Sequence, residues 1–136
     1  MTGFEYHMPQ IAMEILIVMF LFFFKHMIAD FYLQTSYQYS NKGKYLHPGG
    51  LIHSGIHILG SAPIILYVLP TSQAKIIYML LIGEFVIHYH VDWIKERLAK
   101  VYQWTPQQTV FWIAIGTDQF IHYLTYLFII GVLISV

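Results

Sequence analysis

Four long apolar runs occupy most of this sequence and leave room for little else. They cover residues 11–33, 51–69, 74–94 and 108–134, to within a few positions. A helix needs about 20 apolar residues to cross roughly 30 Å of hydrocarbon, and each run approaches or exceeds that length. The mean hydropathy of +0.58 agrees with this interpretation. The sequence therefore predicts an all-α integral membrane protein, a bundle of four transmembrane helices that forms a single domain over residues 1–136.

The basic residues predict how this bundle is oriented. Connections that are rich in Lys and Arg stay in the cytoplasm. Two basic residues lie in the connection after the first run and three follow the third run, whereas the turn between the second and third runs has one: Lys42 and Lys44, then Lys95, Arg97 and Lys100, against Lys75. We therefore expect a protein of the inner (cytoplasmic) membrane with both termini outside the cytoplasm.

Composition narrows the range of partners. The formal net charge is zero, and the sequence has no basic cluster of the kind that neutralises a phosphate backbone. We expect no nucleic-acid partner, and we expect membrane lipid to be the principal one. Cysteine is absent, so any metal must be bound by imidazole or oxygen ligands.

Each apolar run carries two ionisable residues spaced four positions apart. The pairs are His26 with Asp30, His53 with His57, His88 with Asp92, and Asp118 with His122. Residues four apart lie on one face of a helix. The first three pairs lie near helix ends that an up-and-down bundle brings to the same side of the membrane, and the fourth lies deeper. We expect the four pairs to meet in one polar cavity in the cytoplasmic half of the bundle.

These residue types in this setting indicate a metal site. A charged group at the bilayer centre costs at least about 2.5 kcal/mol, so such groups normally pair, bind ions or line water. Helical bundles build metal sites from inward-facing His and carboxylate side chains. All eight residues of the four pairs are therefore candidate ligands of one divalent metal, with some of them supporting its ligands, or of two metals. Zinc is favoured, and manganese or iron also suit the ligand set. For any single pair, a hydrogen bond between helices that serves only packing is an equally good explanation.

Asp30 and three further charged residues have expected roles at or beside this site. Asp30 is a candidate general base as well as a ligand, and Glu84, one turn from His88, is a candidate proton shuttle. Lys95 lies where the third run meets the cytoplasm, and it could bind an anionic head group. We expect Lys25 either to extend toward lipid head groups or to act as a counter-ion to Asp30 or to a lipid phosphate.

Four strings that contain these pairs carry a resemblance to a known family. They are H-M-I-A-D-F-Y-L-Q at 26–34, H-S-G-I-H at 53–57, H-Y-H-V-D-W-I-K at 88–95 and D-Q-F-I-H at 118–122. In this order they resemble domain-of-unknown-function family 3307, a group of small polytopic membrane proteins from bacteria and their phages. The resemblance covers nearly the whole chain after the first ten residues and implies the architecture, not an activity. In residue types alone, the pattern is also similar to the membrane-bound metal-dependent hydrolases, which favours hydrolysis.

Our leading functional hypothesis is a divalent-metal-dependent membrane hydrolase that acts on a lipid or on a lipid-linked phosphate or ester. A proton or metal-ion transporter or channel is the first alternative, since intramembrane His and Asp residues mark such pathways too. The second alternative is a binding or regulatory membrane protein in which a metal or a hydrogen-bond network only holds the helices together. A homo-oligomer could assemble through the small residues of the second helix, Gly55, Gly60, Ser61 and Ala62.

Overall fold

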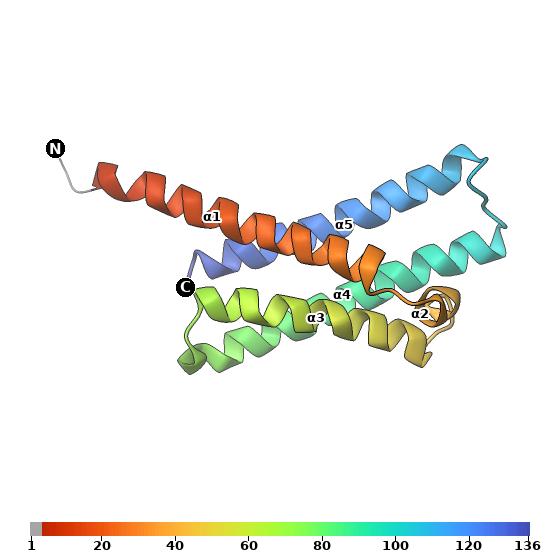
Figure 1. Cartoon of the computed structure of the whole chain (residues 1–136), viewed down its shortest axis with the longest axis horizontal. Helices are drawn as coiled ribbons and strands as arrows, with labels where there is room; N and C mark the ends of the chain where they lie inside the picture. Colours follow the sequence, from red (N-terminus) through yellow and green to blue (C-terminus); the bar gives the residue numbers. More distant parts are fainter. Residues whose placement is uncertain (1–3) are drawn as a thin grey trace.

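The computed structural model describes the backbone from residue 4 and the side chains from residue 9 to the C-terminus, and its regular elements there are all helical (Figure 1). The four long helices are α1 (Phe4–Met27), α3 (Pro48–Val68), α4 (Ala74–Val101) and α5 (Thr109–Leu133). All four are long and apolar enough to cross a membrane. The predicted all-α fold with four potential membrane spans is confirmed.

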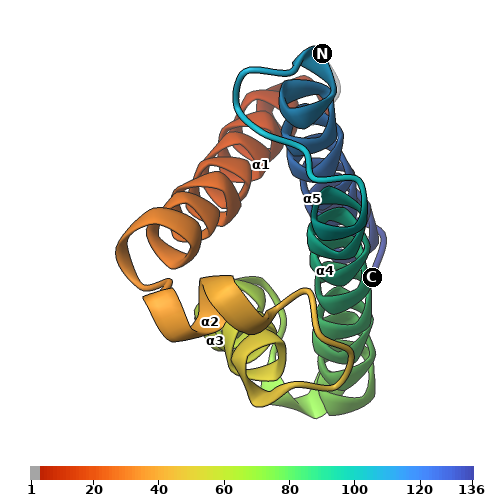
Figure 2. The same cartoon turned by 90° about the vertical axis from the view of Figure 1, so that its right-hand side faces the viewer.

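The helices form an up-and-down bundle in which each long helix packs against two others. Helix α1 contacts α3 and α5, and α4 also contacts α3 and α5. One end of the bundle gathers the C-terminal ends of α1 and α4 and the N-terminal ends of α3 and α5, at the right of Figure 1. We call this end the site end. Figure 2 views the bundle from there and shows the short helix α2 (Ser36–Asn41) lying against α3 at this end.

The opposite half of the bundle is filled by apolar side chains. Phe22 of α1, Ile65 of α3, Leu80 of α4 and Ile129 of α5 belong to one buried cluster. The outer surface is apolar as well, with large exposed side chains such as Phe128, which is 67% exposed. Soluble monomers rarely expose so much contiguous apolar surface. The distribution fits a bundle surrounded by lipid.

Helix α4 is longer than its apolar run, and this length sets the depth of the polar residues. It continues past residue 94 to Val101. Asp92 therefore precedes the end of α4 by nine residues, and Asp118 follows the start of α5 by nine residues. At a rise of about 1.5 Å per residue, both carboxylates lie about 14 Å from their helix ends. The pair on α5 is thus level with the pair on α4.

The connection between α1 and α3 is held against the bundle by hydrogen bonds. It contains α2, whose N-cap Thr35 accepts a hydrogen bond from the backbone N–H of Gln38. The Gln38 side chain in turn accepts from the backbone N–H of Thr35, which completes a capping box. Further along, the backbone N–H of Leu46 donates to the hydroxyl of Tyr89 on α4 at 2.6 Å. These contacts hold the segment against the site end of the bundle.

Candidate metal centre

Two groups of His and Asp side chains meet inside the site end, and each could hold a metal ion. The first group is Asp30, His53, His57 and His88, and the second group is His88, Asp92 and His122. Within each group, one ligand atom of every residue lies within 4.8 Å of the others. His88 belongs to both groups. The structure therefore presents two adjoining groups, where the sequence allowed one metal or two in a shared cavity.

Local helix geometry aims these side chains at one another. His53 and His57 are one turn apart on α3, as are His88 and Asp92 on α4. Asp30 lies in a π-helical turn, Ile28–Tyr32, which continues α1 and is closed by the hydrogen bond from the Leu33 N–H to the Ile28 carbonyl. Such turns widen a helix by one residue and are frequent at functional sites.

The spacing of the ligand atoms fits metal coordination. Ligands about 2.0–2.1 Å from a tetrahedral zinc ion lie about 3.3–3.4 Å from one another. The Oδ1 atom of Asp30 is 3.1 Å from Nε2 of His57 and 3.3 Å from Nε2 of His53. The Oδ2 atom of Asp92 is 3.2 Å from Nε2 of His53. These distances correspond to the edges of a coordination polyhedron of that size.

Unpaired buried ring nitrogens also indicate a metal site. Among the side chains of residues 9–136, neither ring nitrogen of His53 or of His88 has a hydrogen-bond partner, and Nδ1 of His57 and Nε2 of His122 lack one too. All four side chains are fully buried. Buried polar atoms without partners are rare because each one costs free energy. Coordination of a metal would satisfy one ring nitrogen of each ligating histidine.

Asp92 is oriented across both groups. Its Oδ2 atom faces His53 and is 3.8 Å from Nε2 of His88, and its Oδ1 atom is 3.5 Å from Nε2 of His122. A carboxylate that directs one oxygen to each of two neighbouring sites can bridge two metal ions, which lie about 3.5–4 Å apart in two-metal sites. The residues thus fit one metal or two.

His26, a candidate ligand in the sequence, lies outside both groups and has its own hydrogen bonds. Its Nδ1 atom is 2.8 Å from the hydroxyl of Tyr126, and its Nε2 atom is 3.0 Å from Oε1 of Gln119. The same Nε2 atom is 3.1 Å from Oδ2 of Asp30. Gln119 also donates to Oδ2 of Asp30 and, at 3.2 Å, to Oδ2 of Asp118. His26 and Gln119 therefore orient the Asp30 carboxylate, the support that ligating carboxylates usually have.

Asp118 lies beside the second group without belonging to it. Its buried Oδ1 atom is 3.6 Å from Nε2 of His122 and has no hydrogen-bond partner in the described part of the chain. Its Oδ2 atom is 3.5 Å from Nζ of Lys95, which is also 3.3 Å from Oε1 of Glu96. The structure places Lys95 at the edge of the centre, with 18% of its side chain exposed.

The profile of a family described as "Protein of unknown function (DUF3307)" matches residues 18–136. The chain belongs to the DUF3307 family. The match includes all four His and Asp pairs, which confirms the resemblance in the sequence. No curated protein and no solved structure matches the chain.

One residue of the centre in this DUF3307 protein is not apparent from its sequence. Lys42, directly after α2, is 4% exposed, and its Nζ donates to Oδ2 of Asp92 at 3.0 Å. It stands in a polar connection two positions from Lys44, which is exposed. No pattern of spacing or hydropathy distinguishes the two lysines, and only the packing of the connection does.

Glu84 and Lys25 form an ion pair one turn deeper than the centre. The Nζ atom of Lys25 is 2.5 Å from Oε1 of Glu84 and donates to the carbonyl of His57 at 3.1 Å. Ser61 also donates to Glu84. Lys25 therefore does not extend to head groups, and its direct partner is Glu84 inside the bundle. Glu84 is buried and belongs to neither ligand group of the DUF3307 protein.

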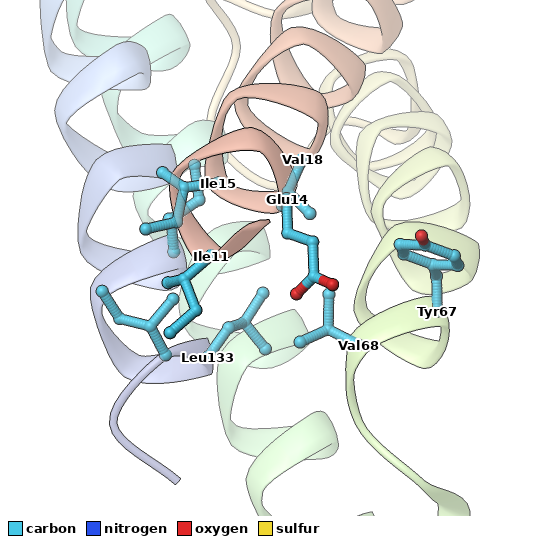
Figure 3. A pocket seen from close by; sticks show the side chains of 9 residues that line it. Ile11, Glu14, Ile15, Val18, Tyr67, Val68 and Leu133 are labelled. Atoms are coloured by element: carbon cyan, nitrogen blue, oxygen red, sulfur yellow. The ribbon is translucent and has the colours of Figure 1, made fainter. Parts of the chain in front are cut away.

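A separate cavity of about 280 Å³ lies at the far end of the bundle (Figure 3). It is lined mainly by apolar residues of α1, α3 and α5, including Ile11, Val68 and Leu133. Glu14 extends from α1 toward Val68, and Tyr67 lies at the edge of the same cavity. The apolar cluster around Phe22 separates this cavity from the His and Asp groups.

Proposed function

We propose that this DUF3307 protein is a divalent-metal-dependent membrane hydrolase that acts on a lipid or on a lipid-linked phosphate or ester. The observation that carries the proposal is the pair of adjoining ligand groups that share His88, with Asp92 directed at both. Two-metal sites of this kind are typical of enzymes that hydrolyse phosphate esters. The predominance of imidazole favours zinc, and manganese and iron also accept these ligands.

The residues around the groups are suited to hydrolysis. A divalent metal polarises a phosphoryl or carbonyl oxygen and activates water. Asp30 is the most accessible carboxylate of the centre, with 14% of its side chain exposed against 6% for Asp92, and it can accept a proton from water. Lys42 and Lys95 lie against Asp92 and Asp118 and provide positive charge for an anionic substrate. Glu84 forms an ion pair with Lys25, so we assign the proton transfer to Asp30 and not to Glu84.

The position of the centre supports an enzyme more than a transmembrane pathway. A cavity of about 350 Å³ between α1 and α5 has aromatic walls, including Phe24 and Phe31, and reaches His26 and Gln119. Exposed Phe31 places this cavity on the lipid-facing side, from which a lipid could enter. Beyond the centre, the far half of the bundle is closed by packed apolar side chains. We propose that the site end faces the cytoplasm.

Metal content is the direct test. We would purify the protein in mild detergent without chelator and measure bound metal by inductively coupled plasma mass spectrometry. About two equivalents of a transition metal are expected in the wild type, and His88→Ala should lose both because His88 is shared. His90→Ala is the matched control, since His90 lies on the same helix, is partly exposed and bonds only the Val86 carbonyl in the described structure.

The hydrolysis assay follows from the metal result. Metal-loaded protein should release product from a lipid phosphate or ester, and His88→Ala should not. If the wild type binds no metal even after reloading, the hydrolase proposal fails. Proton flux in vesicles would then test the transporter alternative, and unfolding measurements would test a network that serves only structure.

A further inference from the structure

An apolar groove runs between α4 and α5 and ends at the centre. It has a volume of about 240 Å³, and its walls are Val91, Ile94, Leu98, Ala114, Thr117 and Ile121. Ile94 and Leu98 are partly exposed on the outer surface, so the groove opens toward the lipid. Its polar residues include Lys95 and Asp118. A groove with this lining is suited to one hydrocarbon chain whose polar end lies beside Lys95.

A second cavity continues from the groove toward the membrane surface. It has a volume of about 400 Å³ and shares Lys95, Trp104 and Ala114 with the groove. Its lining adds Lys100, Glu96 and Ser40, so the two cavities together contain two ammonium groups and two carboxylates, Glu96 and Asp118. Two lysine side chains in one lining suit an anionic head group. Together the two cavities match an amphiphile with an apolar chain and a negatively charged end.

The junction of the two cavities touches the second ligand group through Asp118. Nζ of Lys95 is 3.5 Å from Oδ2 of Asp118, and the buried Oδ1 of Asp118 is 3.6 Å from Nε2 of His122. A group bound at Lys95 would therefore lie next to the centre. The α1–α5 cavity lacks this charge, since no Lys or Arg is found in the part of its lining that the structure describes.

We infer that the α4–α5 groove binds a chain of a membrane lipid with a phosphate head group, and that Lys95 and Lys100 bind the phosphate beside the second ligand group. Lysine ammonium groups commonly bind phosphate through charge-assisted hydrogen bonds. The claim that the bound lipid is a substrate rests on the proposed hydrolase function, and it narrows the substrate to phosphate-bearing lipids. Binding of the lipid can be measured without turnover.

Native mass spectrometry of the protein, as purified and after chelation, tests this inference, since the chelated protein binds lipid without turnover. The probes are dioleoylphosphatidic acid, dioleoylglycerol and glycerol 3-phosphate. We expect phosphatidic acid adducts to exceed dioleoylglycerol adducts about fivefold, and Lys95→Gln to remove most of this preference because it deletes one charge-assisted contact. Lys75→Gln is the matched control, since Lys75 is exposed at the start of α4, at the other end of the bundle.

Groove-filling variants test where the chain lies. Ala114→Trp should reduce the phosphatidic acid adduct about fivefold, because the indole ring would displace part of the lipid chain from its apolar contacts in the groove. Gly116→Trp, on the same helix, should not, because no described atom lies within 4 Å of a Cβ built there. If Ala114→Trp does not fold, Ile94→Trp fills the same groove from the rim of the facing wall.

Three results would overturn the inference: equal adducts with both lipids, equal loss in the Ala114 and Gly116 variants, or tight binding of glycerol 3-phosphate that Ala114→Trp leaves unchanged. The last result would identify a site for soluble phosphates. The same spectra report bound metal by mass, which separates the two proposals. Selective lipid binding without metal would end the hydrolase proposal alone, whereas metal without lipid selectivity would end this inference alone.

Discussion

Among single residues, side chains with the same sequence pattern have different hydrogen-bonding environments in the centre. His26 and His88 are both buried, and each begins a pair with an Asp four positions later. His26 has hydrogen-bond partners on both ring nitrogens, whereas both ring nitrogens of His88 lack one among the side chains that the structure describes. The difference makes His88 the stronger candidate ligand and His26 a candidate for a supporting role.

This difference predicts the effect of His26→Ala. The variant should keep the metal stoichiometry of the wild type but bind metal about 10–100-fold more weakly, the usual effect of losing a residue that orients a ligand. Gln119→Ala should act in the same direction, because Gln119 holds the same Asp30 oxygen. A competitive titration with a chromogenic chelator measures the affinity. If His26→Ala lost a full equivalent of metal at saturating concentration, His26 would belong to the ligand set.

The Lys25–Glu84 pair makes a separate prediction about stability. Glu84→Ala leaves a buried ammonium group without its carboxylate, so the free energy of unfolding should fall by about 3–5 kcal/mol. Lys25→Met combined with Glu84→Leu should recover most of that loss, since well-packed apolar residues often replace a buried ion pair without cost. Denaturant unfolding in detergent, followed by circular dichroism, measures both variants. If the double variant were as unstable as Glu84→Ala, the loss would come from packing and not from the unpaired charge.

At the scale of helices, length and hydropathy were enough to predict the four long elements. They could not predict the π-helical turn at Ile28–Tyr32, because one extra residue in a turn does not change the length or hydropathy of an apolar run in a recognisable way. Helix α2 has only six residues and is polar. Its capping box, Thr35 with Gln38, was the one signal in the sequence that could have revealed it. Lys42 was missed for the same reason, since its burial depends on how α2 packs.

The packing of α2 predicts a contrast between two glycines of α3. A Cβ at Gly50 would lie 3.1 Å from the ring of Tyr89 and 3.4 Å from Cα of Lys42, whereas no described atom lies within 4 Å of one at Gly55. Gly50→Ala should therefore push the Lys42 segment away from α4 and cost about 1–3 kcal/mol. Gly55→Ala should leave the segment in place.

Amine labelling with acetic acid N-hydroxysuccinimide ester, read by peptide mass spectrometry, detects this displacement. Lys42 should be protected in the wild type and in Gly55→Ala, and it should become reactive in Gly50→Ala. Exposed Lys44 is an internal standard that reacts in all three proteins. Equal protection of Lys42 in both glycine variants would show that Gly50 does not control its burial.

At the scale of the whole molecule, the bundle is polarised. The His and Asp groups, Lys42 and the α4–α5 groove lie toward the site end, and the apolar cluster fills the other half. The sequence predicted that the four pairs converge, because each pair forms a polar stripe on one face of an apolar helix and such stripes face the bundle interior. Their division into two groups that share His88 could not be predicted, since it depends on how far α4 extends and how the helices cross.

The same polarity predicts the orientation in the membrane. Of the seven Lys and Arg residues, Lys75 lies at the far end and Lys25 inside the bundle, so the remaining five lie at the site end. This asymmetry should keep the site end in the cytoplasm.

Because the chain has no cysteine, single-cysteine variants can report directly which side of the membrane each end of the bundle faces. Ser72→Cys, in the turn at Thr71–Gln73, should react in intact cells with a membrane-impermeant maleimide, and Lys44→Cys should react only after permeabilisation. Ser135→Cys, just after α5, should behave like Ser72→Cys because both lie at the far end. The reverse pattern would place the centre and its groove on the outer side of the membrane, and the search for a substrate would move to the lipids of that leaflet.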